Sequence, residues 1–350
     1  MYKLCFRITL LCFLLAVSSL IAAGQTEQPA PAELLFRTPA VMQASELLRA
    51  GKTDAALEML LGQAKSDPEN HEIKYLLGLG YYQKADYTRA VENLAPAVKQ
   101  LPRDSPQYRQ GVQMLGLSHY LLGHVKDALP YLEQFSAWSP EKVEISYTLG
   151  LSYIQTRQPE QARAAFARMF KVAPASAAAY LINAQMMIRQ RFEELAETEL
   201  RQALALDPKL PQANFLLGEL AIYRADIALG IELLQKEIAV NPAFGMAYYR
   251  LGEAYTRQLK WDEAISPLQK SIWLNPYFSG PYIVLGKVYL KKVDLVNAEN
   301  ILRRALQMDP NNYSGHHLLA QVLQQANRPD EARKEFALAE QLRGNAEREK

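Results

Sequence analysis

Residues that could take part in catalysis or bind a metal ion are few and scattered in this sequence. Residues 116–120 (GLSHY) begin like the nucleophile elbow of a hydrolase, but the closing glycine and the strand–turn–helix setting are missing. His316 and His317 are adjacent, so on a helix they would point about 100° apart and could not easily share a metal ion. Residues 78–80 (GLG) lack a phosphate-binding pattern. The sequence therefore predicts a protein that is not an enzyme, with no catalytic residue, no cofactor and no metal site.

The N-terminal residues 1–24 have the layout of a secretory signal peptide. A short basic start precedes an apolar stretch from Ile8 to about Ile21, and the small residues 22–24 (AAG) follow it. We therefore expect an exported protein, periplasmic or secreted, that is cleaved at the end of this segment. The alternative is an uncleaved leader that anchors the chain in a membrane, since the apolar stretch is almost long enough to span one. Residues 25–36 are expected to form a Pro/Ala-rich linker.

The cysteines and charges exclude several other classes of protein. Cys5 and Cys12 both lie in the expected leader, so the cleaved chain would contain no cysteine. Disulfides, thiol catalysis and cysteine metal sites would then all be excluded. The chain has 39 basic and 37 acidic residues, and removing the leader with Lys3 and Arg7 leaves equal numbers of each. This balance gives no reason to expect nucleic acid or an anionic membrane surface as the partner.

Prolines mark a regular period in the rest of the chain. Successive prolines are 34 residues apart, except for one interval of 38, at Pro68, Pro102, Pro140, Pro174, Pro208, Pro242, Pro276 and Pro310. Proline interrupts a continuous helix, so each of them marks a turn. Alanine, leucine and glutamine are abundant between the prolines, and β-branched runs are scarce. This composition predicts helices in preference to strands.

Three positions recur between the prolines. A small residue comes first, at Gly78, Gly116, Gly150, Ala184, Gly218, Gly252, Gly286 and Ala320. Twelve positions later another small residue follows, at Ala90, Ala128, Ala162, Ala196, Gly230, Ala264, Ala298 and Ala332. Four further on is a bulky apolar residue, at Leu94, Leu132, Phe166, Leu200, Leu234, Leu268, Leu302 and Phe336. Two small residues let antiparallel helices approach closely, and the bulky residue fills the space beside the crossing.

This pattern resembles the tetratricopeptide repeat. The motif LG-x-x-Y occurs at 149–153, 251–255 and 285–289, and alanine, a bulky apolar residue and proline follow it. The resemblance implies an all-α fold, a right-handed superhelical solenoid of antiparallel helix pairs. With the small residue as position eight, nine repeats are expected at 37–70, 71–104, 109–142, 143–176, 177–210, 211–244, 245–278, 279–312 and 313–346, before a charged tail at 347–350. Four additional residues, 105–108, are expected to lengthen one connection.

The resemblance also implies where a partner would bind. In this family the first helix of each pair lines a concave face, chiefly at positions two, five, nine, twelve and thirteen of the repeat. On this chain the predicted partner-binding groove comprises Tyr75, Leu79, Tyr82, Tyr147, Leu151, Ile154, Phe215, Glu219, Tyr223, Tyr249, Glu253, Arg257, Lys287 and Lys291, with Ile283, His317 and Gln321 in further positions. The alternative for each side chain is that it fills a gap between adjacent repeats.

These observations predict a non-catalytic scaffold for protein–protein interaction in the cell envelope or outside the cell. Its partner would be a peptide or protein segment bound along the concave groove, which is apolar and aromatic over its N-terminal two-thirds and basic at its C-terminal end. An alternative is an accessory subunit of a machine for polysaccharide synthesis, modification or export. Binding of a glycan would distinguish this alternative from a scaffold that binds protein. A third hypothesis is an enzyme with a site in the groove. The sequence shows no clustered acid/base pairs that would support it.

Overall fold

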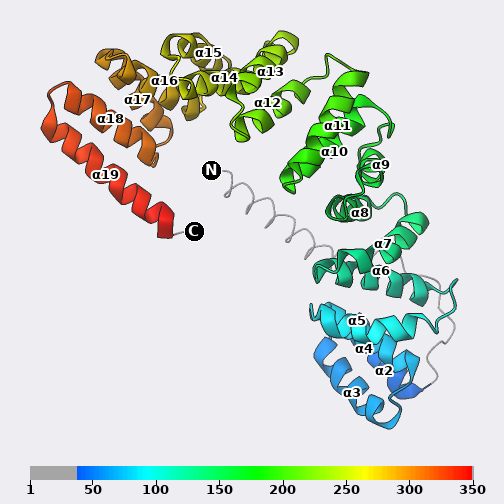
Figure 1. Ribbon diagram of the computed structural model, residues 1–350. Coiled ribbons are helices and arrows are strands. Elements are labelled where there is room, and N and C mark those ends of the chain that lie inside the picture. Colours follow the sequence, from blue (N-terminus) through cyan, green and yellow to red (C-terminus); the bar gives the residue numbers. More distant parts are fainter. Residues whose placement is uncertain (1–37, 349–350) are drawn as a thin grey trace. The chain divides into compact units, whose positions relative to one another are not determined.

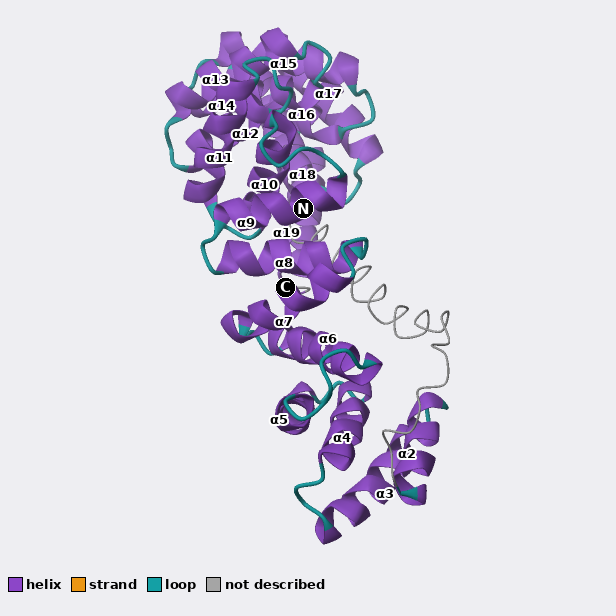
Figure 2. Ribbon diagram, turned by 90° about the vertical axis from the view of Figure 1, so that its right-hand side faces the viewer, coloured by secondary structure: helices purple, strands orange, loops and turns teal. Residues whose placement is uncertain are grey.

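The computed structural model describes residues 38–348. The leader expected at 1–24, the linker expected at 25–36 and the last two residues of the charged tail lie outside the described residues. Over the described range the chain forms helices joined by short loops and contains no strand (Figures 1 and 2). The prediction of an all-α fold built from helix pairs is confirmed.

The helices fall into two compact units. Unit 1 ends at Glu141, and unit 2 begins at Lys142. Unit 1 contains α2 (Pro39–Arg49), α3 (Thr53–Ser66), α4 (His71–Gln83), α5 (Tyr87–Val98), α6 (Pro106–Leu121) and α7 (Val125–Trp138). Unit 2 contains α8 (Val143–Gln155), α9 (Pro159–Phe170), α10 (Ala177–Arg189), α11 (Glu193–Leu206), α12 (Ala213–Tyr223), α13 (Ile227–Val240), α14 (Gly245–Arg257), α15 (Trp261–Leu274), α16 (Ser279–Lys291), α17 (Leu295–Met308), α18 (Tyr313–Gln325) and α19 (Pro329–Arg348).

Each unit is built from neighbouring helix pairs. The two helices of a pair pack against each other, and the second helix of one pair contacts the first helix of the next, as α15 contacts α16 and α17 contacts α18. First helices of adjacent pairs also touch, as α14 and α16 do. Figure 1 shows the second helices α13 and α15 on the outer side of unit 2. Each pair thus buries its apolar surface against its neighbours in the sequence.

The small residues lie where the two helices of a pair cross. A Cβ atom added to Gly150 would lie 2.4 Å from Cζ of Phe166, and one added to Gly252 would lie 2.5 Å from Cγ of Leu268. Both bulky side chains are fully buried. Gly218 is less tightly covered, since its nearest side-chain atom, Cγ of Leu234, would be 3.2 Å away. The spacing in the sequence therefore reflects the close helix crossing that we expected.

Two elements differ in length from the expectation. The additional residues before Arg109 were expected to lengthen a connection. The connection between α5 and α6, residues 99–105, is indeed longer than the one between α7 and α8, residues 139–142. Three of the additional residues also form the first turn of α6, which has 16 residues where α8 has 13. Ser105 caps this turn, because its hydroxyl accepts a hydrogen bond from the Tyr108 amide over 3.1 Å. At the other end, α19 continues to Arg348, so it includes the first two residues of the expected charged tail.

The turn between the two helices of each pair contains one residue in the left-handed conformation. These residues follow the period of the prolines, at Gly51, Ala85, Gly123, Arg157, Arg191, Ala225, Leu259, Val293 and Asn327. At Val293 the turn has the Schellman pattern, in which the Val293 amide donates to the Leu290 carbonyl and the Asp294 amide to the Tyr289 carbonyl. A β-branched residue is strained there, because its Cβ crowds the backbone when φ is positive.

Replacing Val293 by glycine is expected to stabilise the protein. The valine has φ +62° and a side chain that is 69% exposed, so the change relieves strain and removes little packing. The relief of about 1–2 kcal/mol exceeds the entropic cost of glycine, about 0.5–1 kcal/mol, and thermal unfolding should report the difference as a raised midpoint. Gly123→Val, the reverse change at φ +77° with open space around it, should lower the midpoint. A lowered midpoint for Val293→Gly would contradict the strain.

Candidate functional site

An open groove of about 650 Å³ lies at the C-terminal end of unit 2. It is lined by side chains of α16, α18 and α19, which are gathered at this end of the unit in Figure 1. The lining residues are Ile283, Val284, Lys287, Tyr313, Ser314, His317, Leu318, Phe336, Ala339, Glu340 and Arg343. On each helix the lining positions, some of them adjacent pairs, recur at intervals of three or four residues, which is the spacing that places side chains on one helix face.

The floor of the groove is apolar and aromatic. Leu318 and Phe336 pack against the buried cluster formed by α16 to α19. The ring of His317 lies edge-on to Phe336, with 5.3 Å between the ring centroids. The neighbouring His316 is buried on another side of α18, where Nδ1 lies 2.6 Å from Glu335 and Nε2 lies 2.8 Å from the Pro310 carbonyl oxygen. The two adjacent histidines therefore have separate roles, one in the groove and one in packing.

The rim of the groove carries basic groups. Lys287 is exposed, as is Lys291 one helical turn further along α16. Within residues 38–348 neither lysine forms an ion pair or a hydrogen bond. Arg343 on α19 has a distant partner in Glu340, 3.8 Å away. Lys291 is not among the residues that line the groove, so Lys287 is the lining cation without an ion-pair partner in the described part of the chain. A positive charge beside an apolar floor favours a ligand that combines an acidic group with a bulky apolar group.

The structure divides the fourteen predicted groove residues by exposure. Those that are buried are Tyr75, Leu79, Leu151 and Ile154. Those that are half-buried are Tyr82, Tyr147, Phe215, Glu219, Tyr249 and Glu253. Those that are exposed are Tyr223, Arg257, Lys287 and Lys291. Of these fourteen residues, Lys287 alone is among those that line the groove of α16, α18 and α19. Ile283 and His317, which were predicted as further positions of the binding face, also line it.

Several of the buried and half-buried members have partners within the fold. The Tyr75 hydroxyl donates to Gln110 over 2.8 Å, and burial raises the pKa of Tyr82 to about 12. The ring of Phe215 contacts Phe244 with 5.0 Å between centroids, and Tyr249 contacts Phe278 in the same way at 5.2 Å. In each case an aromatic residue of a first helix meets a phenylalanine before the next first helix. Phe215 and Tyr249 therefore pack between adjacent repeats, which is the alternative role considered for such side chains.

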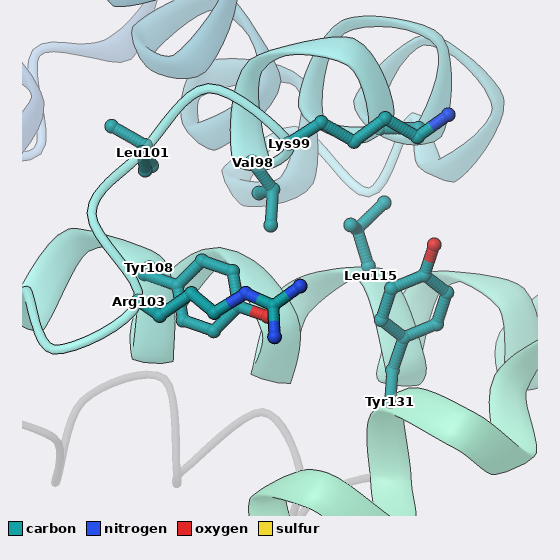
Figure 3. Close-up of a pocket in the computed structure, with 8 residues that line it drawn as sticks. Val98, Lys99, Leu101, Arg103, Tyr108, Leu115 and Tyr131 are labelled. Carbon is teal, nitrogen blue, oxygen red and sulfur yellow. The ribbon is translucent and has the colours of Figure 1, made fainter.

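A second cleft lies in unit 1 and is much smaller. Its volume is about 200 Å³, and side chains of α5, α6, α7 and the connection between α5 and α6 line it. Figure 3 shows Val98, Leu115 and Tyr131 among its walls, with Arg103 reaching in from the connection. This volume is below the range of about 300–1,000 Å³ that is usual for ligand sites, so the groove of unit 2 is the better candidate.

The contribution of α19 to the groove does not follow from the sequence pattern. The family pattern places the binding face on first helices, whereas Phe336, Ala339 and Arg343 belong to the second helix of the last pair. These side chains of α19 face Lys287 of α16 and His317 of α18 across the groove. The signal available in the sequence was the continuation of helical spacing past Phe336 with no proline to end it.

No helix of the described part is long and apolar enough to cross a membrane.

Comparison with known proteins agrees with the helix pairs. Two family models, both described as tetratricopeptide repeat, match residues 41–106 and 215–276 in one case and 120–185 and 289–348 in the other. Together they cover more than half of the chain, which therefore belongs to the tetratricopeptide repeat family. It is a solenoid protein of the scaffold type, a class that is consistent with protein–protein interaction.

One curated protein and several solved structures show similarity. The BBSome complex member BBS4 of Mus musculus is 32% identical over 131 residues, which are 35% of this chain and 24% of that protein. The chain thus spans about a quarter of the length of that relative. A crystal structure of MamA is 22% identical with a TM-score of 0.44, over 47% of this chain and 96% of that one. YrrB, described as a TPR protein with an unusual peptide-binding site, is 16% identical with a TM-score of 0.46, over 52% and 93%.

Proposed function

We propose that this protein is a non-catalytic scaffold that binds a protein or peptide segment in the groove of α16, α18 and α19. The observation that carries the proposal is an open groove of about 650 Å³ with an apolar floor and a basic rim. Such a volume accommodates a few side chains of a bound segment. Rigid aromatic residues such as Tyr313 and Phe336 supply contact area at a low entropic cost.

The charge on the rim specifies the chemistry of the partner. An acidic side chain of the bound segment would meet Lys287, and a bulky apolar side chain would lie on Leu318 and Phe336. The mouse relative is by name a member of a complex, which is consistent with a scaffold. The proposal includes the nine repeat boundaries expected from the sequence and a place in the cell envelope or outside the cell, for which the signal-like residues 1–24 are the support.

Site-specific crosslinking in the native cells tests this function. A photoreactive phenylalanine analogue at Ser314, an exposed residue of the groove, is expected to give a covalent adduct with a protein partner. The same analogue at Lys236, exposed on the outer helix α13, should give none. Lys287→Glu should reduce the adduct at Ser314 by roughly tenfold, since it places like charge beside the acidic group of the partner. The matched variant Lys236→Glu should leave the adduct unchanged.

Two outcomes of this experiment would contradict the proposal. Equal adducts at Ser314 and Lys236 would mean that the contact is non-specific. A polysaccharide adduct in place of a protein adduct would favour an accessory subunit of a polysaccharide machine.

A further inference from the structure

Three side chains that can bind metal ions meet at the turn between α6 and α7 in unit 1. His119 lies in the last turn of α6, His124 directly precedes α7, and Asp127 lies in the first turn of α7. One potential ligand atom from each lies within 4.8 Å of the other two. The turn is closed by Gly123 at φ +77° and by a hydrogen bond of 2.9 Å from the His124 amide to the His119 carbonyl oxygen. The backbone thus brings together one residue of α6, one residue of the turn and one residue of α7.

The side chains of this cluster have few other partners. Nδ1 of His119 is buried and has no hydrogen-bond partner among the described residues, and a buried polar atom without a partner is uncommon. Tyr131 stacks on the His119 ring at 5.9 Å with an angle of 8°, which holds the imidazole in place. Within residues 38–348 the Asp127 carboxylate forms no ion pair.

The cluster also departs from the repeat at two of its three positions. The position of His119 is tyrosine in four other pairs, at Tyr81, Tyr153, Tyr255 and Tyr289. The position of His124 is aspartate in three other pairs, and the side chains of Asp86, Asp226 and Asp294 each cap the following helix. His124 makes no such cap hydrogen bond. Packing and capping therefore do not explain why histidine stands at both positions.

We propose that His119, His124 and Asp127 bind one divalent transition-metal ion of the zinc type. Two imidazoles and one carboxylate are ligands that suit Zn²⁺, Co²⁺ or Ni²⁺, whereas Mg²⁺ and Ca²⁺ prefer sites made of oxygen ligands alone. Three protein ligands leave at least one coordination position for water. The ion fastens the end of α6 to the start of α7, and it stabilises unit 1 because it binds the folded turn better than the unfolded chain. This site is separate from the groove of unit 2, and its failure would leave the proposed function untouched.

Calorimetric titration of the full chain with Zn²⁺, together with Co²⁺ absorption spectroscopy, tests the site. We expect one Zn²⁺ per chain at micromolar concentrations, a cobalt spectrum of low coordination number, and no competition from Mg²⁺. His119→Tyr restores the residue found in other repeats, so it should fold normally, and it should weaken binding by about tenfold or more. His124→Ala, a change at an exposed side chain, should do the same.

A matched control separates this site from other histidines. His317→Ala, a change at an exposed histidine of unit 2, should leave Zn²⁺ affinity unchanged, and circular dichroism should show equal helicity in all three variants. Zn²⁺ should also raise the thermal midpoint of the wild-type chain but not that of His119→Tyr. The proposal is overturned if the wild-type chain binds no Zn²⁺ in this range, or if His119→Tyr and His124→Ala bind it as tightly as the wild type.

Discussion

Replacing Arg163 by methionine is expected to destabilise unit 2 by about 3–5 kcal/mol, the usual cost of removing one partner from a buried ion pair. The Arg163 guanidinium on α9 lies 2.8 Å from the Glu199 carboxylate on α11. Glu199 is only 4% exposed, and Asn183 on α10 donates a further hydrogen bond to it over 2.7 Å. Without the arginine, an ionised carboxylate stays buried between three helices with one amide to compensate it.

The loss at Arg163 should depend on pH. Burial raises the pKa of Glu199 above its ordinary value, and Arg163 and Asn183 oppose this shift. A carboxyl whose pKa is raised on folding binds its proton more tightly in the folded state, so stability increases as the pH falls through that pKa. Removing Arg163 raises the pKa of Glu199 further. The difference between variant and wild type should therefore shrink as the pH is lowered from about 7 to about 5.

Denaturant unfolding, followed by circular dichroism at both pH values, measures the effect. The matched control is the double variant Arg163→Met with Glu199→Met, which removes both charges and should recover much of the lost stability. A single variant as stable as the wild type at neutral pH would show that the ion pair contributes little. A loss that stays constant between the two pH values would show that Glu199 is not its cause.

Replacing Gly252 by leucine is expected to destabilise unit 2 by about 3 kcal/mol, because it overpacks a close helix crossing. The added Cβ alone would lie 2.5 Å from Cγ of Leu268 and 3.3 Å from the Ala264 carbonyl oxygen. Leu268 is fully buried, so its side chain has little room to move. Even Gly252→Ala should lower the thermal midpoint, although alanine is the better helix former.

Gly344 offers the matched control in the same unit. It lies within α19, and an added Cβ there would meet no atom within 4 Å. Gly344→Ala should therefore raise stability by about 0.5–1 kcal/mol, the ordinary gain in a helix. If Gly252→Ala raised the midpoint as Gly344→Ala does, the crossing would be looser than the structure indicates. Gly218→Leu should cost less than Gly252→Leu, since the atoms around Gly218 are further away.

The periodic part of the fold could be predicted from the sequence because it depends on pairs of residues at fixed spacing. The distance of sixteen residues from Gly252 to Leu268 reflects a single crossing, and that crossing recurs throughout the array. The left-handed turn residues could not be predicted in the same way. Leu259 and Val293 are poor choices for positive φ, and the packing of the helices on either side imposes the conformation on them.

The functional residues could be predicted only in part, because the family pattern describes an average repeat. Lys287, Ile283 and His317 follow from that pattern, but Phe336 and Arg343 lie on a second helix, where the pattern places no binding residues. The cluster of His119, His124 and Asp127 extends across a turn. His124 and Asp127 are three positions apart, but His119 lies on the preceding helix, so no single helical or strand spacing joins all three and the structure was needed to bring them together.

The long helix α6 bears on how such an array can change in length during evolution. Its additional turn begins at Pro106, before a remainder that matches the other first helices. Four residues make slightly more than one helical turn, so an insertion of this size inside a helix would rotate the part before it by only about 40°. An insertion of one or two residues would rotate it by about 100° or 200° and exchange buried faces for exposed ones. Duplications and deletions that survive selection should therefore come as single helical turns or as whole helix pairs.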